Sequence, residues 1–114
     1  MVELPIKIRA NGVGSERPRT LPEAFYETTQ AHINYPCMFV ERNGKVLQWT
    51  WGEYFKESMN FAKALAKYNI AERSGVSIMG FNAPEWAIAF QGSVMYNCIG
   101  NGIYITNEPE ACSY

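Results

Sequence analysis

The sequence predicts an α/β fold in which a β-hairpin precedes a parallel βαβ unit with flanking helices. Two short runs rich in β-branched residues, 76–80 and 102–106, each lead into an Asn-x-Pro-Glu sequence. An uncharged stretch of helical length joins these runs, which gives the order strand, helix, strand, helix. Earlier in the chain, Asn43-Gly44 separates two strand-like runs, as expected of a hairpin with a type I′ turn.

The length and composition indicate one domain that belongs to a larger structure. The chain has 114 residues, enough for one core. Charged residues make up 18% of it, below the usual figure of about 25%, so its surface is less polar than that of a free-standing small domain. The net charge is -1 and no cluster of Lys and Arg occurs. The sequence therefore predicts no nucleic-acid partner and no electrostatic binding to an anionic membrane.

The cysteines and the first residues indicate the compartment. Cys37, Cys98 and Cys112 are odd in number and lack metal-ligand spacing, which favours reduced thiols. Residues 1–10 contain charged residues and no apolar segment typical of a signal peptide. We therefore expect a cytoplasmic protein, with attachment to the surface of an intracellular membrane as an alternative. The uncharged stretch 86–107 is long enough for a membrane span, but its amides, glycines and following strand favour a helix buried within a larger domain.

Residues 1–19 are expected to form an irregular N-terminal arm, and residues 20–114 an incomplete domain. Gly12-Val13-Gly14 lacks the preceding strand and third glycine of a dinucleotide-binding loop. Thr20 and Glu23 form a capping box that opens a helix to about His32. We expect Phe25, Thr28, Thr29 and His32 on one face of it. His32 is the one histidine, but no partner is identifiable, so a helix-terminal role is favoured over acid–base catalysis.

The turn sequence and the spacing of apolar residues predict the pairing of the hairpin and the position of the next helix. A two-residue turn pairs Val40 with Leu47 and Met38 with Trp49, which predicts a core-facing side with Glu41 and Gln48 on the other side. Thr50 and Glu53 form a second capping box, which opens a helix to about Asn69. An apolar stripe at helical spacing predicts that this helix is half-buried; it consists of Phe55, Met59, Ala62, Leu65 and Ala66.

Asn82 and Asn107 are predicted to be the N-caps of the last two helices. In this reading Pro84 lies in the first turn, Glu85 completes a capping box, and Phe81 packs on Trp86 as a hydrophobic staple. Both Asn positions follow parallel strands, where α/β sheets commonly bind ligands. Structural capping is favoured over phosphate binding, because proline removes a donor at each helix start and carboxylates stand where a phosphate would bind, those of Glu85, Glu108 and Glu110.

No catalytic or metal-binding residue can be assigned from the sequence, and the cofactor-binding residues stay unknown. A glycine-rich loop that ends in Lys-Ser or Lys-Thr does not occur. We also find no Ser/His/Asp or Cys/His set with an assignable geometry, and no metal-ligand cluster.

The chain resembles the N-terminal segment of adenylate-forming acyl-CoA synthetases of the long-chain, bubblegum-type branch. The match is collinear from about residue 14, and its most specific parts are Gly-Phe-Asn at 80–82 and Tyr-x-Thr-Asn at 104–107. The other matching blocks are residues 14–15, 18, 20, 22–25, 51–54, 75–79, 85–86, 102–103, 110–112 and 114.

This resemblance implies a ligase that joins a fatty acid to coenzyme A with ATP and Mg²⁺. The family's phosphate loop, its adenine- and ribose-binding residues and its C-terminal lysine all lie beyond the matched stretch, so none is carried over. We therefore expect an incomplete N-terminal part of an AMP-binding domain that ends within its last helix and is inactive alone. The alternative is a non-catalytic α/β interaction module derived from that scaffold.

Overall fold

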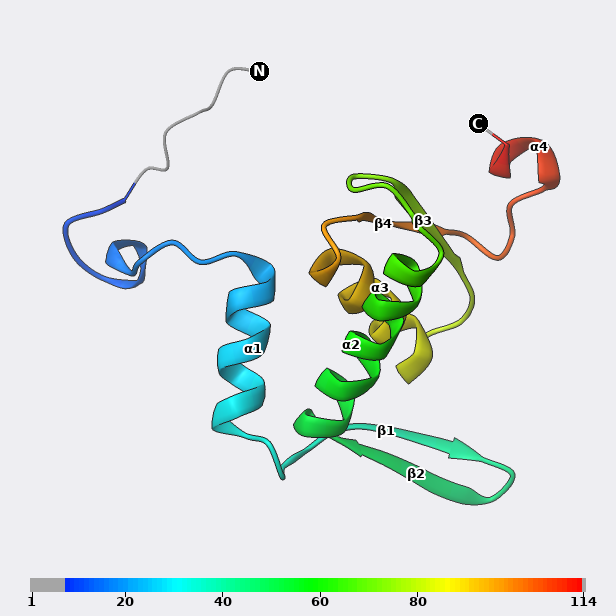
Figure 1. The fold of residues 1–114 in the computed structure, drawn as a ribbon. Helices are drawn as coiled ribbons and strands as arrows, with labels where there is room; N and C mark the ends of the chain where they lie inside the picture. Colours follow the sequence, from blue (N-terminus) through cyan, green and yellow to red (C-terminus); the bar gives the residue numbers. More distant parts are fainter. Residues whose placement is uncertain (1–7, 114) are drawn as a thin grey trace.

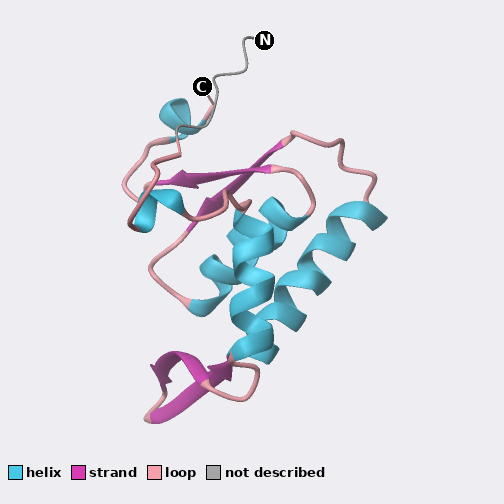
Figure 2. Ribbon diagram, turned by 90° about the vertical axis from the view of Figure 1, so that its left-hand side faces the viewer, coloured by secondary structure: helices cyan, strands magenta, loops and turns pink. Residues whose placement is uncertain are grey.

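The α/β prediction is confirmed: helices lie between two separate two-stranded sheets (Figures 1 and 2). A computed structural model describes residues 8–113; residues 1–7 of the predicted arm and Tyr114 lie outside the described residues. The elements are the 3₁₀ helix Val13–Ser15, α1 Leu21–Ala31, β1 Pro36–Arg42, β2 Lys45–Thr50, α2 Trp51–Lys67, β3 Gly75–Met79, α3 Pro84–Met95, β4 Ile99–Ile103 and α4 Pro109–Cys112. The division into an arm and a domain at residue 20 stays a prediction.

Both Thr-x-x-Glu capping boxes are confirmed. The Thr20 hydroxyl accepts a hydrogen bond from the Glu23 backbone N–H, and the Glu23 carboxylate accepts one from the Thr20 backbone N–H. Thr50 and Glu53 make the same pair of bonds at the start of α2. These backbone bonds lower the pKa of both carboxyl groups, so each cap is charged at neutral pH. His32 is the C-cap of α1, as predicted, but it is exposed rather than on the buried face.

The hairpin has the predicted turn and register but less burial. Asn43 and Gly44 both have positive φ, 52° and 71°, as a type I′ turn requires. Val40 pairs with Leu47 and Met38 with Trp49. The expected core-facing side is only partly covered, since Leu47 is 41% exposed. The reason is that the hairpin projects beyond the first turn of α2 (Figure 1), so this helix covers only part of that side.

The parallel βαβ unit is confirmed, since β3 and β4 pair in parallel and α3 connects them. The predicted position of the second strand, residues 102–106, is wrong: the strand begins three residues earlier and spans Ile99–Ile103. Helix α3 is correspondingly shorter than predicted and ends at Met95, with Asn97 in the left-handed conformation at φ 61°. Ile99, which precedes the predicted strand, is the first residue of β4.

The two predicted Asn caps are wrong by one residue. The N-caps of α3 and α4 are Ala83 and Glu108, and neither makes a side-chain capping bond. Proline takes the first helical position and forces the preceding residue into the extended conformation of an N-cap, which moves the cap to that residue. The predicted staple also fails, because Phe81 is 78% exposed.

The core is small and lies where α2 packs against α1 and α3. Its buried apolar residues are Phe25, Ala62, Ile88 and Cys98. The prediction that α2 is half-buried is confirmed, since Ala62 of its stripe is buried and Phe55, Met59 and Leu65 are half-buried. Ala66 is exposed, and Ser58, which the pattern missed, is fully buried. The radius of gyration is 17.0 Å, whereas a compact domain of this size has about 13 Å. The fold therefore leaves much apolar surface uncovered, which agrees with its low charge content.

Candidate functional site

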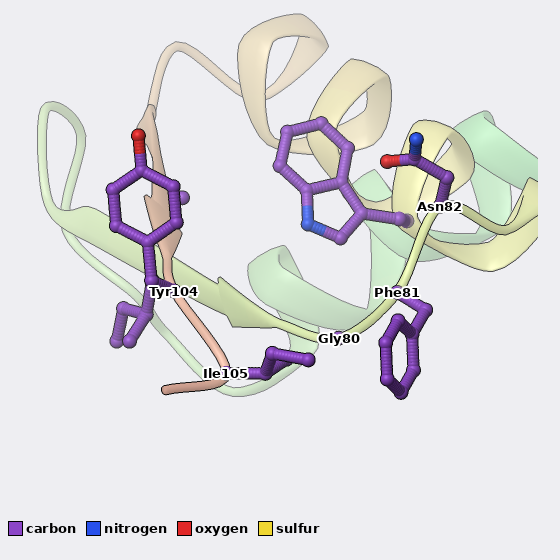
Figure 3. A pocket seen from close by; sticks show the side chains of 8 residues that line it. Gly80, Phe81, Asn82, Tyr104 and Ile105 are labelled. Carbon is purple, nitrogen blue, oxygen red and sulfur yellow. The ribbon is translucent and has the colours of Figure 1, made fainter. Parts of the chain in front are cut away.

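The candidate site is a hollow of about 450 Å³ at the carboxyl ends of β3 and β4, which we call the strand-end hollow. It is lined by residues 80–82, by Trp86 of α3 and by residues 102–105. Figure 3 shows Tyr104 and Asn82 on opposite sides of it. Open parallel sheets commonly bind ligands at this edge, and the volume is within the usual range for small-molecule sites.

Trp86 of α3 lines the hollow, and its ring is held in place by stacking on the ring of Phe90. The rings of Trp86 and Phe90 stack with their centroids 5.5 Å apart and an interplanar angle of 13°. Gly100 makes this packing possible, because a Cβ there would lie 2.5 Å from the Phe90 ring. At Gly102, a Cβ would lie 3.5 Å from the Trp86 ring. Gly100 thus lets the ring stack lie close to the strand, whereas a side chain at Gly102 would make an ordinary van der Waals contact.

The start of α3, beside the hollow, already has a carboxylate next to it, that of Glu85. Arg42 donates two hydrogen bonds of 2.7 Å to the two carboxylate oxygens of Glu85, in the first turn of α3. These bonds, with a further bond from the Glu85 backbone N–H, lower the pKa of the Glu85 carboxyl group to about 2. Pro84 has no N–H to offer. The start of α3 is therefore occupied by a carboxylate of the chain itself, which disfavours a phosphate there.

Because of the Arg42–Glu85 pair, the free energy of unfolding of the chain should depend on pH in the acidic range. The pKa of Glu85 is lower in the folded state, so the stabilisation is complete above the unfolded-state pKa of about 4.3 and is lost as the pH falls toward 2. Both side chains are about half exposed, so we expect no more than about 1 kcal/mol. Urea unfolding at pH 5 and pH 3 should show a smaller loss in Arg42→Gln than in the unchanged chain. Equal losses in both proteins would contradict a role for the pair.

His32, Cys37 and Tyr54 are not among the residues that line the hollow. His32 lies at the far end of α1, beside the ring of Tyr35. Burial raises the pKa of the Cys37 thiol and of the Tyr54 hydroxyl, and the latter donates a 3.3 Å bond to the Ala87 carbonyl. All three cysteines are free. Within residues 8–113 no group of His, Cys, Asp and Glu is suited to hold a metal ion, and no helix there is long and apolar enough to cross a bilayer.

The structure brings one of the two predicted Asn positions to the hollow. Asn82 lines it, whereas Asn107 lies beyond it in a turn where its backbone N–H bonds the Tyr104 carbonyl. Sequence reasoning missed Phe81 and Tyr104, which are 78% and 79% exposed. Both follow closely after a strand, so an aromatic residue at each strand end was the available signal. Gly12-Val13-Gly14 lies in the exposed segment around the 3₁₀ helix, away from the hollow.

The chain matches the family described as AMP-binding enzyme over residues 25–114. It is 36% identical over 112 residues to the long-chain-fatty-acid–CoA ligase ACSBG2 of Gallus gallus, a match covering 98% of this chain and 15% of the relative. It is 31% identical over 109 residues to the ligase ACSBG1 of Mus musculus, which covers 96% of this chain and 15% of that relative. The chain therefore spans about one sixth of the length of the curated relatives it matches.

Solved structures show the same fold at low sequence identity. The fatty acid AMP ligase from Legionella pneumophila superposes with a TM-score of 0.70 and 14% identity, over 81% of this chain and 16% of that one. The N-terminal subdomain of Klebsiella oxytoca NpsA superposes with a TM-score of 0.68 and 16% identity, over 79% and 23%. The fold is thus that of the N-terminal subdomain of adenylate-forming enzymes. Since the family match covers most of its length, this chain belongs to the AMP-binding enzyme family.

Proposed function

We propose that the chain is the N-terminal part of a long-chain fatty acid–CoA ligase and serves that enzyme as scaffold. The observation that carries the proposal is the collinear match of 98% of the chain to such ligases. In the proposed reaction the fatty acid carboxylate attacks the α-phosphorus of ATP and pyrophosphate leaves. The thiolate of coenzyme A then attacks the acyl carbonyl of the acyl-adenylate, and AMP leaves.

Two observations on the described residues argue against a site for the nucleotide or its metal ion in this part of the enzyme. Glu85 and Pro84 block phosphate binding at the start of α3, and no metal-ligand cluster exists within residues 8–113. The proposed chemistry therefore lies in the longer enzyme, which would use ATP and coenzyme A as substrates and Mg²⁺ as cofactor. We further propose a cytoplasmic enzyme, with attachment to the surface of an intracellular membrane as the alternative.

Exchange of the aligned segment tests the proposal. This chain should replace the matching segment of Gallus gallus ACSBG2, and the chimera should retain ATP–pyrophosphate exchange that depends on palmitate. The 114-residue chain alone should show no exchange. As a control, Gly92→Val in the chimera should abolish the activity, because it separates α2 from α3. A folded but inactive chimera would favour a non-catalytic interaction module, and exchange by the chain alone would disprove the scaffold role.

A further inference from the structure

The base of the β1–β2 hairpin is fixed by backbone hydrogen bonds and by the continuity of the chain. The Trp51 N–H donates a 3.0 Å bond to the Tyr35 carbonyl, and the Gly52 N–H donates a 2.9 Å bond to the Ile33 carbonyl. Thr50 is both the last residue of β2 and the N-cap of α2, so no linker separates the strand from the helix. The base therefore cannot move without disturbing the start of α2.

The outer end of the hairpin is held differently, by one ion pair. Arg42, the last residue of β1, donates its two hydrogen bonds to Glu85, which lies 43 positions later in the first turn of α3. Among the hydrogen bonds and ion pairs of residues 8–113, this pair alone joins the two strands to α3 or to the loop before it. Residues 43–48, which form the turn and most of β2, are all exposed.

Between the base and the ion pair lies a cavity of about 260 Å³, which we call the hairpin cleft. Residues 38–40 of β1 line one side of it, and residues 82–84 at the start of α3 line the other. The Phe39 ring, in the lining, is 59% exposed. Atoms that face a gap lose most of the van der Waals attraction that close packing would give. Packing across the cleft is therefore loose, and the Arg42–Glu85 pair is the specific contact that keeps its two sides together.

We propose that the hairpin is a hinged flap, which turns about its base at Thr50 and is held closed by the Arg42–Glu85 pair. In the open position Arg42 leaves Glu85 and the hairpin cleft widens, while the backbone bonds at the base stay intact. The two side chains are 41% and 57% exposed, so the pair is weak enough to open reversibly. This inference does not depend on the proposed function, because it concerns a motion within this chain.

The position of the flap affects the strand-end hollow through Asn82, which lines both cavities. The loop between β3 and α3 is thus a wall shared by the hairpin cleft and the hollow. When the flap opens, this loop loses its contact on the hairpin side, so the shape of the hollow depends on the position of the hairpin. A molecule that binds only one of the two positions would shift the equilibrium between them.

Fluorine NMR of the 114-residue chain measures the opening. Phe39 is replaced by 4-trifluoromethylphenylalanine, whose chemical shift reports whether the ring lies in the cleft or in water. Arg42→Gln should raise the ratio of open to closed chains about fivefold, as expected for loss of an exposed ion pair. Lys45→Gln is the matched control, since Lys45 is the ladder partner of Arg42 and also removes one positive charge from the end of the hairpin. An unchanged ratio in Arg42→Gln, or an equal rise in Lys45→Gln, would overturn the proposal.

A double-mutant cycle tests whether the pair itself holds the flap. Glu85→Gln should raise the open-to-closed ratio as much as Arg42→Gln does, and the two substitutions together should add nothing further, because each alone already breaks the same contact. Ratios that multiply in the double variant would mean that the two residues act independently, and they would overturn the proposal.

Amide hydrogen exchange distinguishes turning of the hairpin from its unfolding. The Trp51 and Gly52 amides, which make the bonds at the base, should exchange at the same rate in Arg42→Gln and in the unchanged chain. If their exchange rose about as much as the open-to-closed ratio, the hairpin would be detaching as a whole, and the hinge at Thr50 would be refuted.

Discussion

Gly92→Ala should destabilise the chain by about 1–3 kcal/mol, although alanine normally favours a helix. Gly92 lies at the crossing of α2 and α3, and a Cβ there would come within 2.5 Å of the Ser58 carbonyl oxygen and 2.9 Å of the Phe61 Cβ. The first of these atoms belongs to the backbone of α2, so relief requires the two helices to move apart. The helix propensity gained, about 1 kcal/mol, is too small to offset that separation.

Urea unfolding followed by far-UV circular dichroism measures this effect. Gly80→Ala is the control, since a Cβ at Gly80 meets no atom within 4 Å and its effect should stay within about 0.5 kcal/mol. If Gly92→Ala were neutral or stabilising, the close crossing of α2 and α3 would be refuted.

Phe25→Ala should cost about 3–5 kcal/mol, which is a large part of the stability of a small domain. Phe25 is the buried apolar anchor of α1, and its ring lies 4.8 Å from the ring of Tyr54 and 5.9 Å from that of Phe55. Removing it leaves a cavity between α1 and α2 in a core that has few other buried side chains. Helix α1 should therefore lose most of its attachment to the rest of the fold.

Thermal and urea unfolding, together with proteolysis within α1, would measure this loss. Leu21→Ala is the control on the same helix, because Leu21 is 66% exposed, and it should change the stability by less than about 0.5 kcal/mol. An effect of Phe25→Ala no larger than that of Leu21→Ala would show that α1 does not depend on this contact.

Sequence reasoning succeeded where the determining interactions are local. The capping boxes at Thr20 and Thr50 and the Asn43-Gly44 turn involve residues at most three positions apart, so the pattern contains the whole interaction. The caps of α3 and α4 failed because two local preferences competed. Asn favours the cap position. A proline two residues later takes the first helical position, so the residue between the two becomes the cap.

Features that depend on packing between distant segments could not be read from the sequence. Strand β4 has the sequence Ile-Gly-Asn-Gly-Ile, which has low intrinsic strand propensity. It pairs with β3, and its Gly100 leaves room for the Phe90 ring of α3. The more β-prone run that follows, with Tyr104 and Ile105, lines the hollow instead. The burial of Ser58 likewise follows from the approach of Gly92, 34 positions later in the chain. The family resemblance, in contrast, was identified from the sequence and is confirmed.

The order of contacts along the chain has a consequence for synthesis on the ribosome. β1 pairs with β2, α1 packs on α2, α2 on α3, and β3 pairs with β4, so each of these partners follows the other by at most three elements along the chain. Contacts between near neighbours in sequence form fast and carry a small entropy of loop closure. The segment can therefore fold as it emerges from the exit tunnel, one element after another. In the ligase proposed here, this would give the nascent polypeptide a finished platform before the segments that carry the chemistry are translated.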